Sequence, residues 1–147
     1  MNASPASAAV VVRRTIAASA EVLFDAWLDP IAVAAWMRPG EILRTVATID
    51  ARVGGRYEII MSSESHDYPT TGIYLEIERP RRLVFTWESA AKGPGIGETL
   101  VTVEFLAKGK ATEIVVTHER LPDSARESHR AGWTSGLGKF EEYACRR

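Results

Sequence analysis

Apolar and polar residues alternate along most of the chain with the two-residue period of β-strands, and helical spacing replaces this pattern near both ends. The alternation and the β-branched runs predict seven strands, over residues 9–16, 41–50, 56–62, 72–78, 83–88, 98–106 and 112–119. Glycine, proline or charged turn residues separate most of them. Because strands that follow one another in the chain usually pair, we expect one strongly curved antiparallel sheet of about six or seven strands.

Two short helices are expected directly after the first strand. Ser19 can cap the first helix, and Glu21 would lie in its positively polarised first turn. Asp29 followed by Pro30 has the form of an N-cap with proline in the first helical position. The second helix should extend through Trp36.

The longest expected helix ends the chain. Residues 124–127 have the Ser-x-x-Glu form of a capping box. Residues of one helical face then recur at intervals of three or four, at His129, Trp133, Leu137, Phe140 and Ala144. About 20 residues at 1.5 Å rise give roughly 30 Å, enough to cross the sheet. The elements together predict an α+β fold in which a long C-terminal helix lies across a curved sheet.

Composition and charge exclude several classes of protein. The chain has 147 residues, 46% of them hydrophobic, which suits one globular domain over residues 9–147 after a disordered tail at residues 1–8. Its net charge of −1, with arginine pairs interleaved with acids, disfavours nucleic-acid binding. No apolar run approaches the roughly 20 residues of a membrane span, and no signal peptide is visible, so we expect a cytoplasmic protein, either monomer or homodimer.

The expected terminal helix carries glycines that need a physical reason. Gly132, Gly136 and Gly138 each cost about 1 kcal/mol relative to alanine inside a helix. They either leave room for a ligand between helix and sheet, or allow a close contact between the two without a ligand. Both interpretations stay open at the level of the sequence.

Aromatic residues at the expected sheet–helix interface favour a pocket for a small molecule, since such pockets are mostly apolar with a few polar groups. Trp27 is better explained as a core residue. The candidate ligand-binding residues are Trp36, Tyr57, Met61, Tyr74, Trp87, His118, Trp133 and Leu137.

Catalytic chemistry has weaker candidates. His118 shares strand parity with apolar neighbours and could donate to a ligand, act as a general base, or merely satisfy a core group. Glu88 is the carboxylate that could accompany it, although a residue at the end of a strand is more often a surface acid. The chain has no His-x-x-x-His, Cys-x-x-Cys or phosphate-loop motif, and its lone Cys145 cannot form an internal disulfide. We therefore expect no metal site and no cofactor.

Several segments, in order, resemble one known family. They are residues 19–27 (SAEVLFDAW) with Asp29-Pro30 and Trp36, then 53–57 (VGGRY), 72–77 (GIYLEI), 82–87 (RLVFTW), 117–121 (THERL) and Gly132-Trp133. Together they cover most of the chain after the tail and are similar to the prokaryotic relatives of the activator of heat-shock-protein-90 ATPase. The resemblance implies the helix-grip fold of the START-related, birch-pollen-allergen-like superfamily, with a cavity between sheet and long helix.

That superfamily includes lipid carriers, hormone receptors, cyclases and chaperone activators, so the resemblance implies no single reaction. Three functions remain as hypotheses. The first is binding of a small hydrophobic molecule, a lipid or a metabolite; the second is an enzyme of cyclase, dehydratase or hydrolase type; the third is interaction with a chaperone or another protein. Ligand retention, substrate turnover and a stable complex without ligand would distinguish them.

Overall fold

The computed structural model describes residues 9–89 and 96–146, which form seven strands and three helices. The predicted tail at residues 1–8 and most of the loop predicted before the sixth strand lie outside the described residues. In chain order the elements are β1 (Val10–Ile16), α1 (Ala20–Leu28), α2 (Pro30–Trp36), β2 (Arg44–Ile49), β3 (Arg56–Ser62), β4 (Asp67–Glu78), β5 (Arg82–Ser89), β6 (Glu98–Lys108), β7 (Ala111–Glu119) and α3 (Asp123–Cys145).

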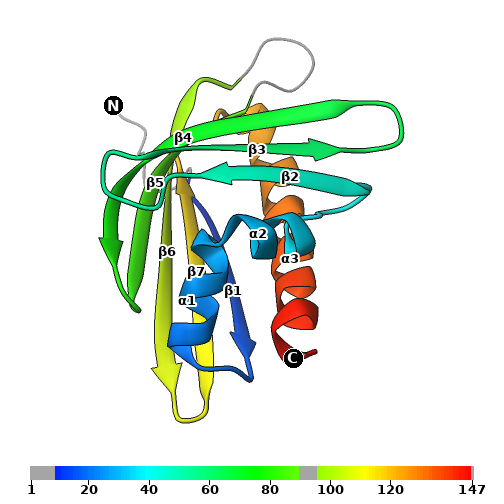
Figure 1. Cartoon of the computed structure of the whole chain (residues 1–147). Coiled ribbons are helices and arrows are strands. Elements are labelled where there is room, and N and C mark those ends of the chain that lie inside the picture. The colour runs from blue at the N-terminus through cyan, green and yellow to red at the C-terminus, as the bar shows by residue number, and fades with distance from the viewer. Residues whose placement is uncertain (1–8, 90–95, 147) are drawn as a thin grey trace.

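All seven strands belong to one antiparallel sheet with the order β1-β7-β6-β5-β4-β3-β2. Strands β2 to β7 therefore form a meander, and β1 joins its far end by pairing with β7. The sheet is strongly curled, so that β2, β3 and part of β4 cross the direction of the other strands (Figure 1). The predicted curved antiparallel sheet, with two short helices after its first strand and a long helix at the end, is confirmed.

The caps of the first two helices are those that the sequence predicts. The Ser19 hydroxyl accepts a hydrogen bond from the backbone N–H of Val22 at 3.2 Å. The Asp29 carboxylate accepts one from the N–H of Ile31 at 3.0 Å, with Pro30 opening the helix. Each cap satisfies one of the orphan donors of a helix N-terminus. These short helices thereby carry buried tryptophans into the core.

The predicted capping box of α3 is wrong. The helix begins at Asp123, one residue before Ser124, and its N-cap is Pro122, which makes no side-chain capping bond. Ser124 therefore lies inside the first turn rather than before it. The negative charge of Asp123 in that turn interacts favourably with the helix dipole, so a charge rather than a side-chain cap stabilises this end.

Strand β4 is five residues longer than the sequence predicts, because it begins at Asp67 instead of Gly72. The polar run from Ser62 onward hides the start of the strand. The Ser62 hydroxyl donates to the Asp67 carboxylate at 2.7 Å across the hairpin, and Thr70 is 1% exposed. Threonine is a good strand former on buried surfaces, and this extension carries Thr70 into the wall of the site described below.

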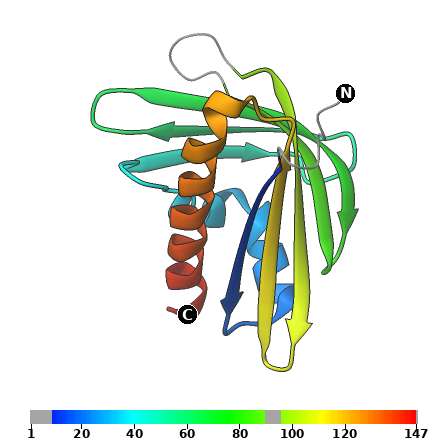
Figure 2. The same cartoon turned by 180° about the vertical axis from the view of Figure 1, so that it is seen from behind.

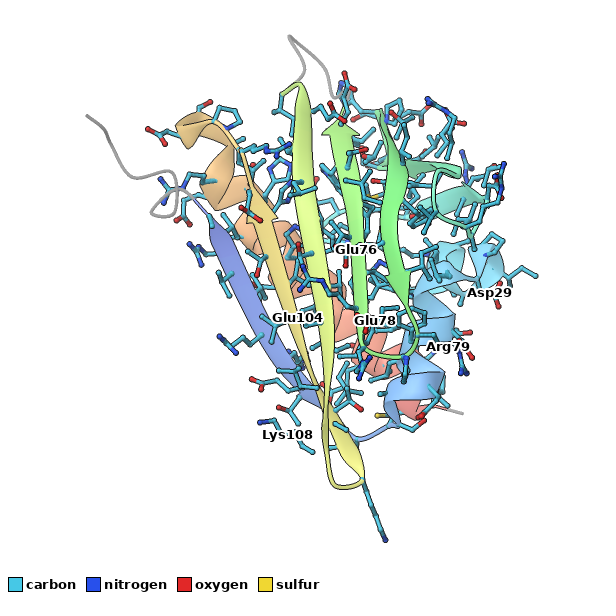
Figure 3. The ribbon with its side chains drawn as sticks, turned by 90° about the vertical axis from the view of Figure 1, so that its left-hand side faces the viewer. Asp29, Glu76, Glu78, Arg79, Glu104 and Lys108 are labelled. Carbon is cyan, nitrogen blue, oxygen red and sulfur yellow. The ribbon has the colours of Figure 1, made fainter. Side chains whose placement is uncertain are left out.

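The two faces of the sheet differ in chemistry. The concave side holds the apolar core, in which Trp87 of β5 packs together with the tryptophans of the three helices, each at most 6% exposed. On the outer face, Arg82 of β5 lies between Glu76 of β4 and Glu104 of β6, with N–O distances of 3.1 and 3.9 Å. Figure 3 shows both glutamates on this face. Such exposed pairs contribute little to stability, so the fold depends on the concave side.

Candidate functional site

A cavity of about 150 Å³ lies between the sheet and the N-terminal half of α3. In both views this half of α3 crosses the direction of β3 and β4 (Figures 1 and 2), and Met61 of β3 and Thr70 of β4 line the cavity together with residues of α3. The cavity is lined by Trp36, Met37, Pro39, Met61, Thr70, Trp87, Ser89, Ser128, His129, Gly132, Trp133 and Gly136. Its deeper wall is buried and largely apolar, whereas Pro39, Ser89, Ser128 and His129 are partly or fully exposed at its rim.

Tryptophan rings form the most rigid part of the wall. The rings of Trp87 and Trp133 have centroids 5.1 Å apart, and Trp36 packs on Phe140 at 4.3 Å. Trp27 lies behind them, 4.8 Å from Trp36 and 6.1 Å from Trp133. Trp27 is thus a core residue, as expected, while the other three tryptophans are shared between core and cavity.

The glycines of α3 make the helical side of this wall. A Cβ atom placed on Gly132 or Gly136 would meet no atom within 4 Å outside the helix's own nearby backbone, and both residues line the cavity. Gly136 is nevertheless buried. A glycine that allowed close helix–sheet contact would have neighbours at this distance, so the structure favours the interpretation that these residues leave room. Gly138 also has open space around it but does not line the cavity.

Replacing Gly136 with alanine is expected to stabilise the ligand-free protein by about 1 kcal/mol, because the helix gains propensity and the new methyl group meets no neighbour. Urea denaturation at fixed pH measures this change. Overpacking of a tight contact would instead cost about 1–3 kcal/mol, so a destabilised Gly136→Ala protein would contradict the open wall.

The structure divides the predicted ligand-binding residues into three groups. Four line the cavity, namely Trp36, Met61, Trp87 and Trp133. Tyr57 and Tyr74, with Trp87 again, surround a separate void of about 10 Å³, which is the volume accessible to about one water molecule. His118 and Leu137 are fully buried and do not line the cavity.

Tyr57 is held by the sheet rather than turned toward the cavity. It pairs with Gly72 of β4, and its hydroxyl donates to the backbone carbonyl of Thr86 on β5 at 2.6 Å. Burial raises the pKa of Tyr57 well above its usual value, as it does the pKa of Tyr74. Both phenols therefore stay protonated, and neither is an acid–base group at neutral pH.

His118 lies one layer behind the cavity wall, in a chain of hydrogen bonds that fixes its tautomer. The Thr99 hydroxyl donates to the Trp87 carbonyl at 2.6 Å, so its oxygen accepts from His118 Nε2 at 2.8 Å. His118 Nδ1 then accepts from Trp133 Nε1 at 3.0 Å. Burial lowers the pKa of His118 to about 3, with a further contribution from nearby His129. His118 is therefore neutral at physiological pH and orients Trp133.

The hypothetical pairing of His118 with Glu88 does not assemble. Glu88 is exposed, while its neighbours Trp87 and Ser89 line the cavity from the opposite side of β5. Strand β5 begins one residue earlier and ends one residue later than the sequence predicts. Because side chains alternate along the strand, Glu88 points away from the cavity. Both ring nitrogens of His118 are already engaged. The structure offers this pair no common substrate position.

The histidine at the cavity is His129, which the sequence indicated only as part of one helical face. Its Nδ1 donates to the Ala125 carbonyl at 2.8 Å, because a carbonyl can only accept. His129 is one turn before Gly132 and Trp133, so helical spacing could have identified it. The other unpredicted lining residues are Met37, Pro39, Thr70, Ser89 and Ser128.

No group of three or more histidine, cysteine, aspartate or glutamate side chains converges within residues 9–89 and 96–146 in a way that could hold a metal ion. None of the helices in this part of the chain is both long enough and apolar enough to cross a bilayer.

Comparison with protein families gives a match over residues 17–144 to the family described as activator of Hsp90 ATPase homolog 1-like protein. The chain belongs to that family. The resemblance that the sequence motifs indicate is thereby confirmed. No curated protein matches the sequence of this family member.

Solved structures agree with this assignment. The crystal structure of a protein from Chromobacterium violaceum is 25% identical with a TM-score of 0.82, covering 94% of this chain and 97% of that one. The solution structure of the AHSA1-like protein from Aeromonas hydrophila is 25% identical with a TM-score of 0.77, covering 92% and 90%. A protein from Arthrobacter aurescens, 16% identical, shares the fold with a TM-score of 0.85 over 99% and 91%. The curved sheet of this family member suggests a ligand-binding domain.

Proposed function

We propose that this family member binds a small apolar molecule in the cavity between the sheet and α3. The observation that carries the proposal is the open wall at Gly136, a buried helical glycine at which an added Cβ atom would meet no atom within 4 Å. Three tryptophans surround the same space. Helix propensity alone would favour alanine at this position. A ligand that occupies the space would explain why glycine is found there instead.

The size of the cavity supports a ligand class. A cavity of about 150 Å³ lined by apolar side chains can accommodate a molecule of the size of benzene. Ser128 is exposed and Ser89 is partly exposed at the rim, so the cavity is open there. A longer molecule could extend outward past these two residues. A small aromatic or alicyclic body, with or without a chain, is the occupant that these dimensions favour.

Binding of toluene tests the proposal without knowledge of the physiological ligand. We expect calorimetric titration to give a dissociation constant of roughly 0.1–1 mM, since a ligand of about seven heavy atoms is limited in affinity. The variant Gly136→Leu should fold and fail to bind, because its side chain would fill the cavity. The matched variant Gly138→Leu, on the same helix but outside the lining, should bind as the parent does.

Two results would contradict the proposal. The first is a parent protein that does not bind toluene up to its solubility limit, and the second is equal binding by Gly136→Leu and the parent. Native mass spectrometry of the purified protein supplies an independent measurement, in which a co-purified small molecule should be absent from Gly136→Leu and present in Gly138→Leu.

A further inference from the structure

His129 brings a ring nitrogen with an unused lone pair to the cavity that it lines. Its Nδ1–H donates to the Ala125 carbonyl one turn back in α3, at 2.8 Å. In the neutral ring the proton is then on Nδ1, and Nε2 is a hydrogen-bond acceptor. Nε2 receives no hydrogen bond from residues 9–89 and 96–146, and it is not one of the buried side-chain atoms left unpaired in these ranges. The side chain is partly exposed, so Nε2 is open to a donor from outside.

The polar side chains beside His129 are already committed to other partners. The ring of His118 lies perpendicular to that of His129, with centroids 5.2 Å apart, but both of its nitrogens are engaged. The hydroxyl of Ser128 donates to the Ala125 carbonyl at 3.0 Å. The partner that satisfies Nε2 is therefore a water molecule or a ligand.

The tryptophan N–H groups of the wall are closed to a ligand. Trp36 Nε1 donates to a backbone carbonyl at 3.3 Å, and Trp133 Nε1 donates to His118 at 3.0 Å. Trp87 Nε1 is buried behind other atoms of the protein, where a molecule in the cavity does not reach it. The aromatic wall therefore offers an occupant the faces and edges of its rings and, at His129, one acceptor.

The charge of the site restricts the kind of donor that can use this acceptor. The described lining residues include no lysine, arginine, aspartate or glutamate. An ammonium group would lose hydration there without gaining an opposite charge, which is costly. An amide would bring a carbonyl together with its N–H, and the wall tryptophans have no free donor for it. A neutral hydroxyl donates one hydrogen bond, and at the open rim its oxygen can still accept one from water.

We propose that the occupant is an apolar molecule with one neutral hydroxyl, an alcohol or a phenol, which donates to His129 Nε2 at the rim of the cavity. The inference rests on the proposed binding function and adds to it the polar group by which the cavity selects among molecules of equal size. The apolar body of the molecule would lie among the tryptophans, with its hydroxyl directed toward α3.

Benzyl alcohol and ethylbenzene test this selection, because they differ only in a hydroxyl that replaces a methyl group. Hydrophobicity alone favours ethylbenzene in every variant, so the informative quantity is the change in the ratio of the two dissociation constants. His129→Phe keeps an aromatic ring and removes the acceptor. We expect it to lower benzyl alcohol affinity about 5-fold, the effect of one hydrogen bond of ordinary strength, and to change ethylbenzene affinity by less than about 2-fold. Calorimetric titration at about pH 8, where a histidine is ordinarily neutral, measures both constants.

A matched variant and a measurement on the unmodified protein complete the test. Ser128→Ala removes a neighbouring rim hydroxyl that is already used within α3, and it should leave the ratio unchanged. In the parent protein labelled with ¹⁵N-histidine, benzyl alcohol should shift the nuclear magnetic resonance signal of His129 Nε2 toward that of a hydrogen-bonded nitrogen, more than ethylbenzene does. This measurement decides the result even if His129→Phe does not fold.

The outcomes separate this inference from the proposed function. An equal loss of affinity for both probes in His129→Phe would show that the histidine only shapes the wall, and it would overturn the inference. An unchanged ratio, or an Nε2 signal that responds equally to both probes, would overturn it as well. In each of these cases the cavity still binds apolar molecules. If neither ethylbenzene nor toluene binds the parent, both proposals fail.

Discussion

Replacing Gly72 with alanine is expected to lower the free energy of unfolding by about 3 kcal/mol, and the melting temperature by roughly 10 °C. A Cβ atom at Gly72 would lie 2.0 Å from the Thr86 carbonyl oxygen and 2.5 Å from the Tyr57 ring. The Tyr57 side chain crosses this position in β4 to reach β5, donating to the Thr86 carbonyl. Neither the backbone nor the buried ring can yield cheaply, so the methyl group would separate three strands.

Thermal and urea melts of Gly72→Ala and the parent measure this effect. The matched control is Gly138→Ala, which makes the same chemical change in open space on α3 and should leave stability equal or slightly higher. If Gly72→Ala unfolds within about 0.5 kcal/mol of the parent, the range of an ordinary surface substitution, the close approach of these strands does not limit the side chain at this position.

The second large effect is a loss of stability in acid that depends on His118. The folded protein lowers the pKa of His118 to about 3, mainly by burial, whereas an unfolded histidine titrates near its usual value of about 6.5. Between these values the unfolded state binds one proton more than the folded state. Stability is therefore full above pH 6.5 and falls as the pH is lowered, by about 1.4 kcal/mol per unit, or about 3 kcal/mol by pH 4.

The variant His118→Gln isolates this contribution, because its amide can accept from Trp133 and donate to Thr99 without titrating. Urea denaturation at intervals from about pH 7.5 to 4 should give a shallower pH dependence for His118→Gln than for the parent, with the largest difference below about pH 6. His66→Gln, in an exposed turn, is the control and should follow the parent. Parallel curves for His118→Gln and the parent would show that the buried ring does not resist protonation.

Much of this fold could be predicted because local signals agree with tertiary structure. The outer face of the sheet carries charged residues such as Glu76 and Glu104, which gives the strands their alternation. The first two helices carry their caps in the sequence. The wrong predictions fall where one residue type suits two structures. Ser124 can cap a helix or lie in its first turn. Thr70 has a polar side chain, which is typical of a loop, but it is buried in a strand.

The site was predictable only as far as one element determines it. Helical spacing places Gly132, Trp133 and Gly136 on one face of α3, but it does not say which strands lie opposite. The partner of His118 is Thr99 on β6, a pairing set by strand register across 19 residues of chain. Alternation alone therefore indicated an inward direction for His118 without showing that two hydrogen bonds already occupy its ring.

Three of the four tryptophans in the chain line the cavity, and Trp27 lies 6.1 Å from one of them. Nearly all of the long-wavelength ultraviolet absorption and emission of the protein thus originates beside the site. The light that an indole emits depends on the groups around it, so a molecule that enters the cavity changes this emission. The intrinsic fluorescence of the unlabelled protein is therefore a direct optical signal of what occupies the cavity.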